Sequence, residues 1–172
     1  MKRRIVFLIG ASGVGKTAVA QLLEQKSPWI NNTFYSDSIG VPTPEEMEIG
    51  PGGGEGWQQW ATEHWVARLA EREEPQQLLE MQTRPSFILP AMEAAPQIDC
   101  QIILLECSSS VRSFRLTELR QQPELANSRM ENWAVYLRGQ ADALGVQSIQ
   151  TDDLTLEEVA AAVEACLRGD RP

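Results

Sequence analysis

This chain has no long apolar run, a single histidine, no closely spaced pair of cysteines and no excess of positive charge. Each of these features argues against a class of protein. No stretch approaches the roughly 20 apolar residues of a membrane-spanning helix, so we expect no membrane association. Three cysteines without C-x-x-C spacing (Cys100, Cys107, Cys166) and one unpartnered histidine, His64, argue against a disulfide framework or zinc site. A net charge of -9 argues against nucleic-acid binding, which relies on Lys and Arg.

The length and composition are those of one soluble domain. The chain has 172 residues, of which 42% are hydrophobic and 23% charged, enough for a sizeable core. The basic start leads into only five apolar residues, Ile5 to Ile9, which is too short for a signal peptide. We therefore expect a single cytoplasmic domain over residues 1–172, either monomeric or homodimeric.

Short apolar runs alternate with stretches of helical periodicity. Strands are expected at residues 5–9, 33–36, 76–79, 101–106 and 146–150, and helices at 57–72, 85–94 and 110–120, with others following Lys16, Ser128 and Thr155. Ser128 with Glu131, and Thr155 with Glu158, have the spacing of capping boxes. This order predicts an α/β fold, a three-layer α/β/α sandwich with a five-stranded parallel sheet. Ligands bind such sheets beyond the carboxyl ends of the strands.

The most specific feature lies between the first strand and the first helix. It reads Gly10-Ala11-Ser12-Gly13-Val14-Gly15-Lys16-Thr17 and matches G-x-x-x-x-G-K-[ST], which arises by chance well under ~1% of the time in a chain of this size. The glycine turn directs backbone N–H groups at phosphates, Lys16 reaches the β- and γ-phosphates, and the Thr17 hydroxyl ligates Mg²⁺. All eight residues are therefore predicted to bind ATP or GTP, with Mg²⁺.

On this motif the chain resembles the small P-loop kinases, a group that includes nucleoside, nucleotide, shikimate and gluconate kinases. The resemblance spans most of the chain: the loop at 10–17, an acidic residue after the second strand, an arginine after the third, an arginine-bearing helix after the fourth, and a final strand-turn-helix. It implies a kinase-like P-loop NTPase fold with a short arginine-bearing lid at about residues 112–130. It also implies ATP and Mg²⁺ as cofactors and a small-molecule acceptor.

The resemblance assigns roles on the acceptor side. Asp37 matches the carboxylate that activates the acceptor hydroxyl, although an Asp here also suits a turn cap. Glu80 matches the carboxylate that orients water on Mg²⁺, and Gln82 or Arg84 then contacts the acceptor. Glu106 ends the next strand in the same way, so the choice stays open; we favour Glu80 because those polar residues follow it.

Two further segments are candidates for moving parts. Residues 112–138 carry five arginines, and closure of this lid would bring positive charge to the transferring phosphoryl group. We assign Arg115 a catalytic role and Arg112 a nucleotide-binding role; surface salt bridging is the alternative for each. Residues 40–56 are expected to form a flexible glycine-rich loop, either an acceptor flap or a passive insertion. Trp57 beside it is a candidate acceptor contact, whereas Trp60 and Trp65 suit the core.

The leading hypothesis is an ATP-dependent phosphotransferase whose acceptor is a nucleoside, a nucleotide or a hydroxylated metabolite. Its alternatives are a nucleotide-dependent regulatory ATPase or switch and a non-catalytic nucleotide-binding protein. The absence of an N-K-x-D segment argues against a guanine-nucleotide switch. The acceptor region matches no particular kinase.

Overall fold

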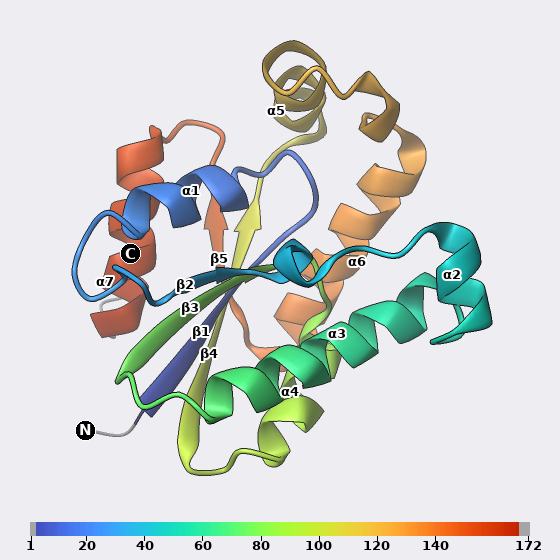
Figure 1. Ribbon diagram of the computed structural model, residues 1–172. Helices are drawn as coiled ribbons and strands as arrows, with labels where there is room; N and C mark the ends of the chain where they lie inside the picture. Colours follow the sequence, from blue (N-terminus) through green and yellow to red (C-terminus); the bar gives the residue numbers. More distant parts are fainter. Residues whose placement is uncertain (1–2, 169–172) are drawn as a thin grey trace.

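A parallel sheet lies at the centre of the computed structural model, which describes residues 3–168 (Figure 1). Its strands are β1 (Arg3–Ile9), β2 (Thr33–Tyr35), β3 (Gln76–Met81), β4 (Ile98–Glu106) and β5 (Gln147–Gln150). They lie in the order β2-β3-β1-β4-β5, and each neighbouring pair is parallel. The five-stranded parallel sheet expected from the sequence is therefore confirmed.

Strand β1 runs through the middle of the core. Residues 5–9 are fully buried, and they alternate between two hydrophobic clusters on opposite faces of the sheet. Successive side chains of a strand point to opposite faces, so a strand covered on both sides must be apolar at every position. This is why the first strand appears in the sequence as a continuous apolar run.

Helices cover both faces of the sheet. On one face α1 (Lys16–Leu23) packs beside α7 (Leu156–Arg168). On the other face lie α3 (Gly53–Ala70), α4 (Pro85–Glu93) and α6 (Ser128–Leu144), as Figure 1 shows. The three-layer α/β/α arrangement is thus confirmed. Within residues 3–168, no helix combines the length and hydropathy needed to cross a bilayer.

The two expected capping boxes have different outcomes. Before α7, the backbone N–H of Thr155 donates to Glu158 at 2.7 Å and the backbone N–H of Glu158 donates to Thr155 Oγ1 at 3.2 Å, as expected. Before α6, the cap is Asn127, whose Oδ1 accepts the N–H of Met130 at 3.0 Å. The box at Ser128 was therefore wrong by one residue, because an asparagine directly before it caps the helix.

Residues 40–56 are not a loop throughout. Residues 44–49 form α2 (Pro44–Ile49), and the glycines from 53 onward lie in the first turn of α3. Thr43 Oγ1 accepts the N–H of Glu46 at 3.3 Å, and the Thr43 N–H donates to Glu46 Oε2 at 2.8 Å. This capping box, with proline at the first helical position, was readable in the sequence. A Cβ on Gly56 would lie 1.9 Å from the Pro51 carbonyl oxygen, so glycine permits the tight turn between α2 and α3.

The arginine-bearing segment follows β4. It begins as α5 (Ser109–Phe114) and continues as a wider π-type turn at Arg115–Leu119, where the N–H of Arg120 donates to the Arg115 carbonyl at 3.0 Å. A short 3₁₀ turn at Pro123–Leu125 then leads to α6. In Figure 1, α5 and these turns lie beyond the end of β4. The helix expected at 110–120 is thus confirmed, as a short α-helix continued by a π-type turn; it ends at Leu119, and Pro123 begins the next turn.

Candidate active site

The phosphate loop joins β1 to α1 and depends on glycine at two crowded positions. Gly10 has φ +153°, and a Cβ there would lie 2.6 Å from the Leu105 carbonyl oxygen. Gly13 has φ +86°, and a Cβ there would lie 3.0 Å from side-chain carbons of Arg112 and Leu116. Side chains at these two positions would displace the loop from β4 and α5. The loop therefore has the compact form that a phosphate cradle requires.

Lys16 lies inside the loop, against the end of β3. Its Nζ donates to the Ala11 carbonyl at 3.2 Å and lies 3.8 Å from Glu80 Oε1. Burial lowers the pKa of Lys16, and the Glu80 carboxylate opposes that shift. Burial raises the pKa of Glu80, opposed by Lys16 and by a hydrogen bond from Thr17. The two buried charges therefore stabilise each other.

Side chains alternate between the two faces of the sheet, and this alternation decides whether Glu80 or Glu106 lies beside the phosphate loop. Glu80 comes two residues after Leu78, which belongs to the core cluster beside α1, so Glu80 lies on the α1 face. Glu106 comes two residues after Leu104, which belongs to the opposite cluster, and it pairs with Arg138 of α6. Glu80, the carboxylate favoured from the sequence, is therefore the one that lies beside Lys16 and Thr17.

Thr17 and Glu80 form an oxygen-bearing pair suited to Mg²⁺. A hydrogen bond from Thr17 is one of the causes that lower the pKa of Glu80, and Thr17 is exposed. Mg²⁺ is held in proteins by one or two carboxylates together with waters and substrate phosphates, so these side chains fit the ion. No group of three or more His, Cys, Asp and Glu residues suited to a metal occurs within residues 3–168.

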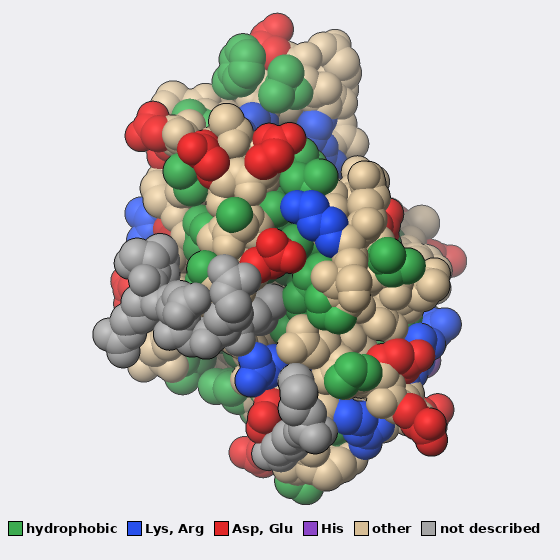
Figure 2. All heavy atoms as spheres, turned by 90° about the vertical axis from the view of Figure 1, so that its left-hand side faces the viewer, with side chains coloured by type: hydrophobic (Ala, Val, Ile, Leu, Met, Phe, Trp, Pro, Cys, Tyr) green, Lys and Arg blue, Asp and Glu red, His purple; other side chains and the backbone are tan. Residues whose placement is uncertain are grey.

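A cavity of about 520 Å³, here called the nucleotide cavity, opens beside the phosphate loop. It is lined by residues 13–19 and by side chains from the lid and from the region after β5, namely Arg115, Leu119, Arg120, Thr151, Leu154, Leu156 and Val159. Figure 2 looks onto the side of the molecule formed by α1 and α7, where hydrophobic side chains are exposed among acidic and basic ones. The polar phosphate loop at one end and leucines at the other suit a nucleotide.

Asp37 lies outside the nucleotide cavity. It is exposed in a 3₁₀ turn (Ser36–Ile39) directly after β2, and its charge is close enough to raise the pKa of both Lys16 and Glu80. It lines a second cavity, of about 290 Å³, together with Trp57 and Gln82. Gln82 Oε1 accepts a hydrogen bond from Ser12 of the phosphate loop at 3.1 Å. The structure thus brings these candidate acceptor residues together beside the loop.

Arg84 lies in a third, adjoining cavity of about 800 Å³. Its Nη1 is 3.0 Å from Glu55 Oε1, and its Nε donates to Gln58 Oε1 at 3.3 Å. The guanidinium also lies over the rings of Trp133 and Tyr136, at 5.3 and 5.2 Å. Arg84 is therefore held firmly in the cavity wall.

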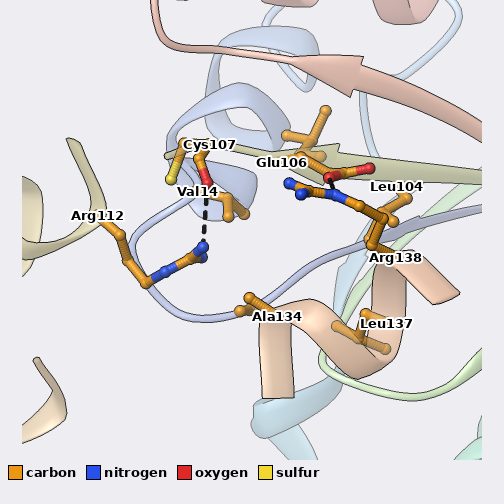
Figure 3. A pocket seen from close by; sticks show the side chains of 10 residues that line it. Val14, Leu104, Glu106, Cys107, Arg112, Ala134, Leu137 and Arg138 are labelled. Atoms are coloured by element: carbon orange, nitrogen blue, oxygen red, sulfur yellow. Dashed lines mark hydrogen bonds and ion pairs between the residues drawn. The ribbon is translucent and has the colours of Figure 1, made fainter. Parts of the chain in front are cut away.

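The two arginines assigned from the sequence are bound by the protein itself. Arg112 is 3% exposed, its Nε pairs with Glu131 at 2.9 Å and its Nη2 donates to the Cys107 carbonyl at 3.0 Å, behind the loop (Figure 3). Arg115 Nη1 donates to Thr151 Oγ1 at 2.8 Å and its Nη2 to the Thr151 carbonyl at 3.0 Å. Arg112 therefore does not line the nucleotide cavity, because Glu131 and the Cys107 carbonyl hold its guanidinium; its nucleotide-binding role stays a prediction.

Arg120 is the lid arginine that sequence reasoning left without a role. Its side chain is exposed, lines the nucleotide cavity and has no hydrogen bond or ion pair to the residues that the structure describes. Its charge contributes to lowering the pKa of Lys16, after the larger effect of burial. No local pattern distinguishes it from its neighbours, because its direction depends on the π-type turn before it.

The two tryptophans expected in the core, Trp60 and Trp65, differ in their burial. Trp65 is buried, and its Nε1 donates to the Ser36 carbonyl at 3.2 Å, as suits a core residue. Trp60 is 46% exposed and stacks between Trp57 and His64, with ring centroids 4.9 Å apart in each pair. The expected core position of Trp60 was therefore wrong, because it lies on the outer side of α3.

Comparisons with known proteins identify the fold. No family model matches the chain, and no curated protein matches its sequence. A shikimate kinase from Acinetobacter baumannii has a similar structure, with a TM-score of 0.63 and 15% identity over 98% of this chain and 94% of that chain. A gluconokinase from Sinorhizobium meliloti has a TM-score of 0.61 and 20% identity, with the same coverage. A sugar kinase from Janibacter sp. has a TM-score of 0.65 and 17% identity, over 96% and 95% of the two chains. The resemblance to the small P-loop kinases is thus confirmed, as a likeness of fold.

Proposed function

We propose that this protein is a phosphotransferase that moves the γ-phosphoryl group of ATP to a small-molecule acceptor. The observation that carries the proposal is the position of Asp37. This carboxylate lines the 290 Å³ cavity and acts electrostatically on Lys16 and Glu80, which lie against the phosphate loop. A group that can accept a proton from a hydroxyl therefore lies beside the groups that hold the donor phosphates.

The donor side supplies positive charge and hydrogen-bond donors. Backbone N–H groups of residues 10–15 and the N-terminus of α1 bind the phosphates, and Lys16 exchanges its contact with the Ala11 carbonyl for phosphate oxygens. Thr17 and Glu80 would hold Mg²⁺, which would supply positive charge to the donor phosphates. Arg120 closes from the lid onto the same phosphates and excludes water.

The acceptor side positions and activates the nucleophile. Trp57 and Gln82 hold the acceptor, Arg84 borders the adjoining cavity, and Asp37 receives the proton of the attacking hydroxyl. The hydrogen bond between Ser12 and Gln82 links acceptor binding to the loop that holds the donor. Arg115 donates to the Val14 carbonyl of the loop and to the Thr151 carbonyl, and Arg112 donates to the Cys107 carbonyl. These contacts fix the start of the lid, so that Arg120 moves relative to a fixed segment.

A product search tests this proposal. The protein is incubated with Mg-ATP and a pooled library of metabolites and nucleosides, and mass spectrometry searches for products about 80 Da heavier, the mass added by phosphoryl transfer. We expect such a product with the wild type and none with Lys16→Ala. ATP hydrolysis that no pooled compound alters and that a protein partner stimulates would contradict the proposal and favour a switch.

A further inference from the structure

The acceptor side contains more space than the reacting centre needs. The cavity with Asp37, of about 290 Å³, adjoins the larger cavity of about 800 Å³, and Gly54, Gln58 and Gln82 line both. Sites for drug-sized ligands span about 300–1,000 Å³. The smaller cavity lies just below this range, and the larger, here called the distal cavity, has room for a further part of the same molecule.

Unused amide groups line this combined space. Oε1 of Gln58 accepts from Arg84 and Oε1 of Gln82 accepts from Ser12, while the NH₂ groups of both side chains have no hydrogen-bond partner within residues 3–168. Asn132, which is exposed on α6, likewise has no side-chain hydrogen bond to the described residues. A side-chain amide can both donate and accept, as a hydroxyl group does. Such a wall suits a ligand that carries several hydroxyl groups.

Aromatic rings border both parts of the space. Trp57 lines the cavity of Asp37, and Trp133 and Tyr136 line the distal cavity. The latter two rings stack on each other, 5.6 Å apart with an interplanar angle of 17°, and Tyr136 is 41% exposed. The negative face of an aromatic ring attracts the C–H groups of a sugar and the edges of a flat ring. Each part of the space therefore offers a surface for one ring of a ligand.

The charges in the distal cavity favour an uncharged second ring. The guanidinium of Arg84 is neutralised by Glu55 at 3.0 Å and lies over the rings of Trp133 and Tyr136. Its Nη1 pairs with Glu55 and its Nε donates to Gln58, so part of its capacity to bind an anion is already used within the protein. Arg129 adds a positive charge at the start of α6 but is exposed to solvent, which weakens its attraction.

We infer that the acceptor is a glycoside with at least two rings. Its sugar ring presents a hydroxyl to Asp37 beside Trp57, and its second ring, a further sugar or a nucleobase, lies against Trp133 and Tyr136. The inference rests on the proposed function for the site of transfer and adds the class of acceptor.

Matched pairs of probes test the inference by binding alone. Glucose is compared with maltose and 4-nitrophenyl glucoside, and ribose with uridine, by saturation-transfer NMR and calorimetry of the full chain with Mg²⁺ and a non-hydrolysable ATP analogue. At least one two-ring probe should bind about tenfold or more tightly than its one-ring counterpart, as expected for an added stacking contact. The inference is overturned if no two-ring probe binds, or if none binds more tightly than its one-ring counterpart.

Variants of α6 locate the second ring. Tyr136→Ala should weaken binding of the two-ring probe roughly tenfold and leave one-ring binding unchanged, whereas Tyr136→Phe should retain most of the affinity. Val135→Ala is the matched control, because Val135 is 67% exposed on the same helix and outside the cavity. Equal loss for both probe sizes would contradict the assignment of the second ring to this wall.

Phosphoryl transfer is followed separately, so the two proposals can fail independently. Phosphorylation of one-ring and two-ring compounds with equal kcat/KM would support the proposed kinase and overturn the two-ring acceptor. Tight, Tyr136-dependent binding of a two-ring probe without any transfer to it would support the second ring's site and contradict the kinase.

Discussion

The ammonium group of Lys16 lies 3.8 Å from the carboxylate of Glu80, and both side chains are buried. The pair joins the phosphate loop to the end of β3. Without a nucleotide, Glu80 compensates the lysine charge in a place that water reaches poorly. Phosphates and Mg²⁺ would take over that compensation, so the contact holds the apo site in a form ready for the donor.

Lys16→Ala should abolish stabilisation by nucleotide. The variant leaves the phosphates without their buried cation, and we expect transfer to fall by at least about 100-fold. The measurement is the rise in the unfolding midpoint when Mg-ADP is added, compared within each variant. Lys26→Ala, at an exposed position near the end of α1, is the control and should retain the full rise. An undiminished rise in Lys16→Ala would place the nucleotide elsewhere.

Asp37→Asn should separate binding from transfer. An amide cannot accept the proton of the acceptor hydroxyl, so we expect kcat to fall by about 10² to 10⁴. Asp37 does not line the nucleotide cavity, so stabilisation by Mg-ADP should persist. Asp142→Asn, at an exposed position on α6, should behave as the wild type. Normal transfer by Asp37→Asn would show that another group takes the proton.

Glu80→Gln and Glu106→Gln form a matched pair of strand-end variants. Because Glu80 lies beside Lys16 at the phosphate loop, its loss should weaken Mg²⁺ affinity by roughly 10- to 100-fold, as for other groups that orient metal ligands. Glu106 pairs with Arg138 instead, so Glu106→Gln should keep normal Mg²⁺ dependence. Titration of Mg²⁺ in the ADP-binding assay distinguishes them. The opposite pattern would assign the metal to Glu106.

Arg120→Ala should mainly affect catalysis, whereas Arg115→Ala should mainly affect stability. Arg120 is exposed and without a partner among the described residues, so its loss should change stability by less than about 0.5 kcal/mol. We expect its loss to lower kcat by about 10² to 10³, if it meets the phosphoryl group. Arg115→Ala removes donors from Thr151 and should cost about 1–3 kcal/mol of stability. Urea unfolding and steady-state kinetics of both variants check these expectations.

The capping box of α7 should produce a dependence of stability on pH. The backbone hydrogen bond from Thr155 to Glu158 lowers the pKa of that carboxyl below its ordinary value of 4.5. A lowered pKa means that the stabilisation is present above pH 4.5 and is lost as the pH falls through the folded value. Wild type should therefore unfold at a higher temperature than Glu158→Gln at pH 7, and the gap should close in acid. Glu157→Gln, in the same turn without this contact, should show a smaller gap.

Local sequence was enough to predict an element wherever chemistry, or burial on both faces of the sheet, restricts the residue types that can occur. The apolar run of β1 predicted a central strand, and the phosphate motif predicted its loop and the helix after it, because phosphate binding needs glycine, lysine and a hydroxyl at fixed spacing. The box at Thr155 could be predicted because all its hydrogen bonds lie within three residues. The box at Thr43 carried the same signal, but the surrounding glycines and prolines concealed a short helix.

Tertiary structure decided the identity of the groups that meet at the site. Glu80 and Glu106 both end apolar strands, and only the face on which each lies brings the first to Lys16 and the second to Arg138. Likewise, five arginines share one segment, and only the folded chain shows that the side chains of Arg112 and Arg115 contact Glu131 and Thr151, whereas the Arg120 side chain has no hydrogen bond or ion pair to the described residues. Sequence by itself determined the phosphate loop, since its chemistry is local. The partners across the sheet depend on side-chain direction and helix packing, which only the folded chain defines.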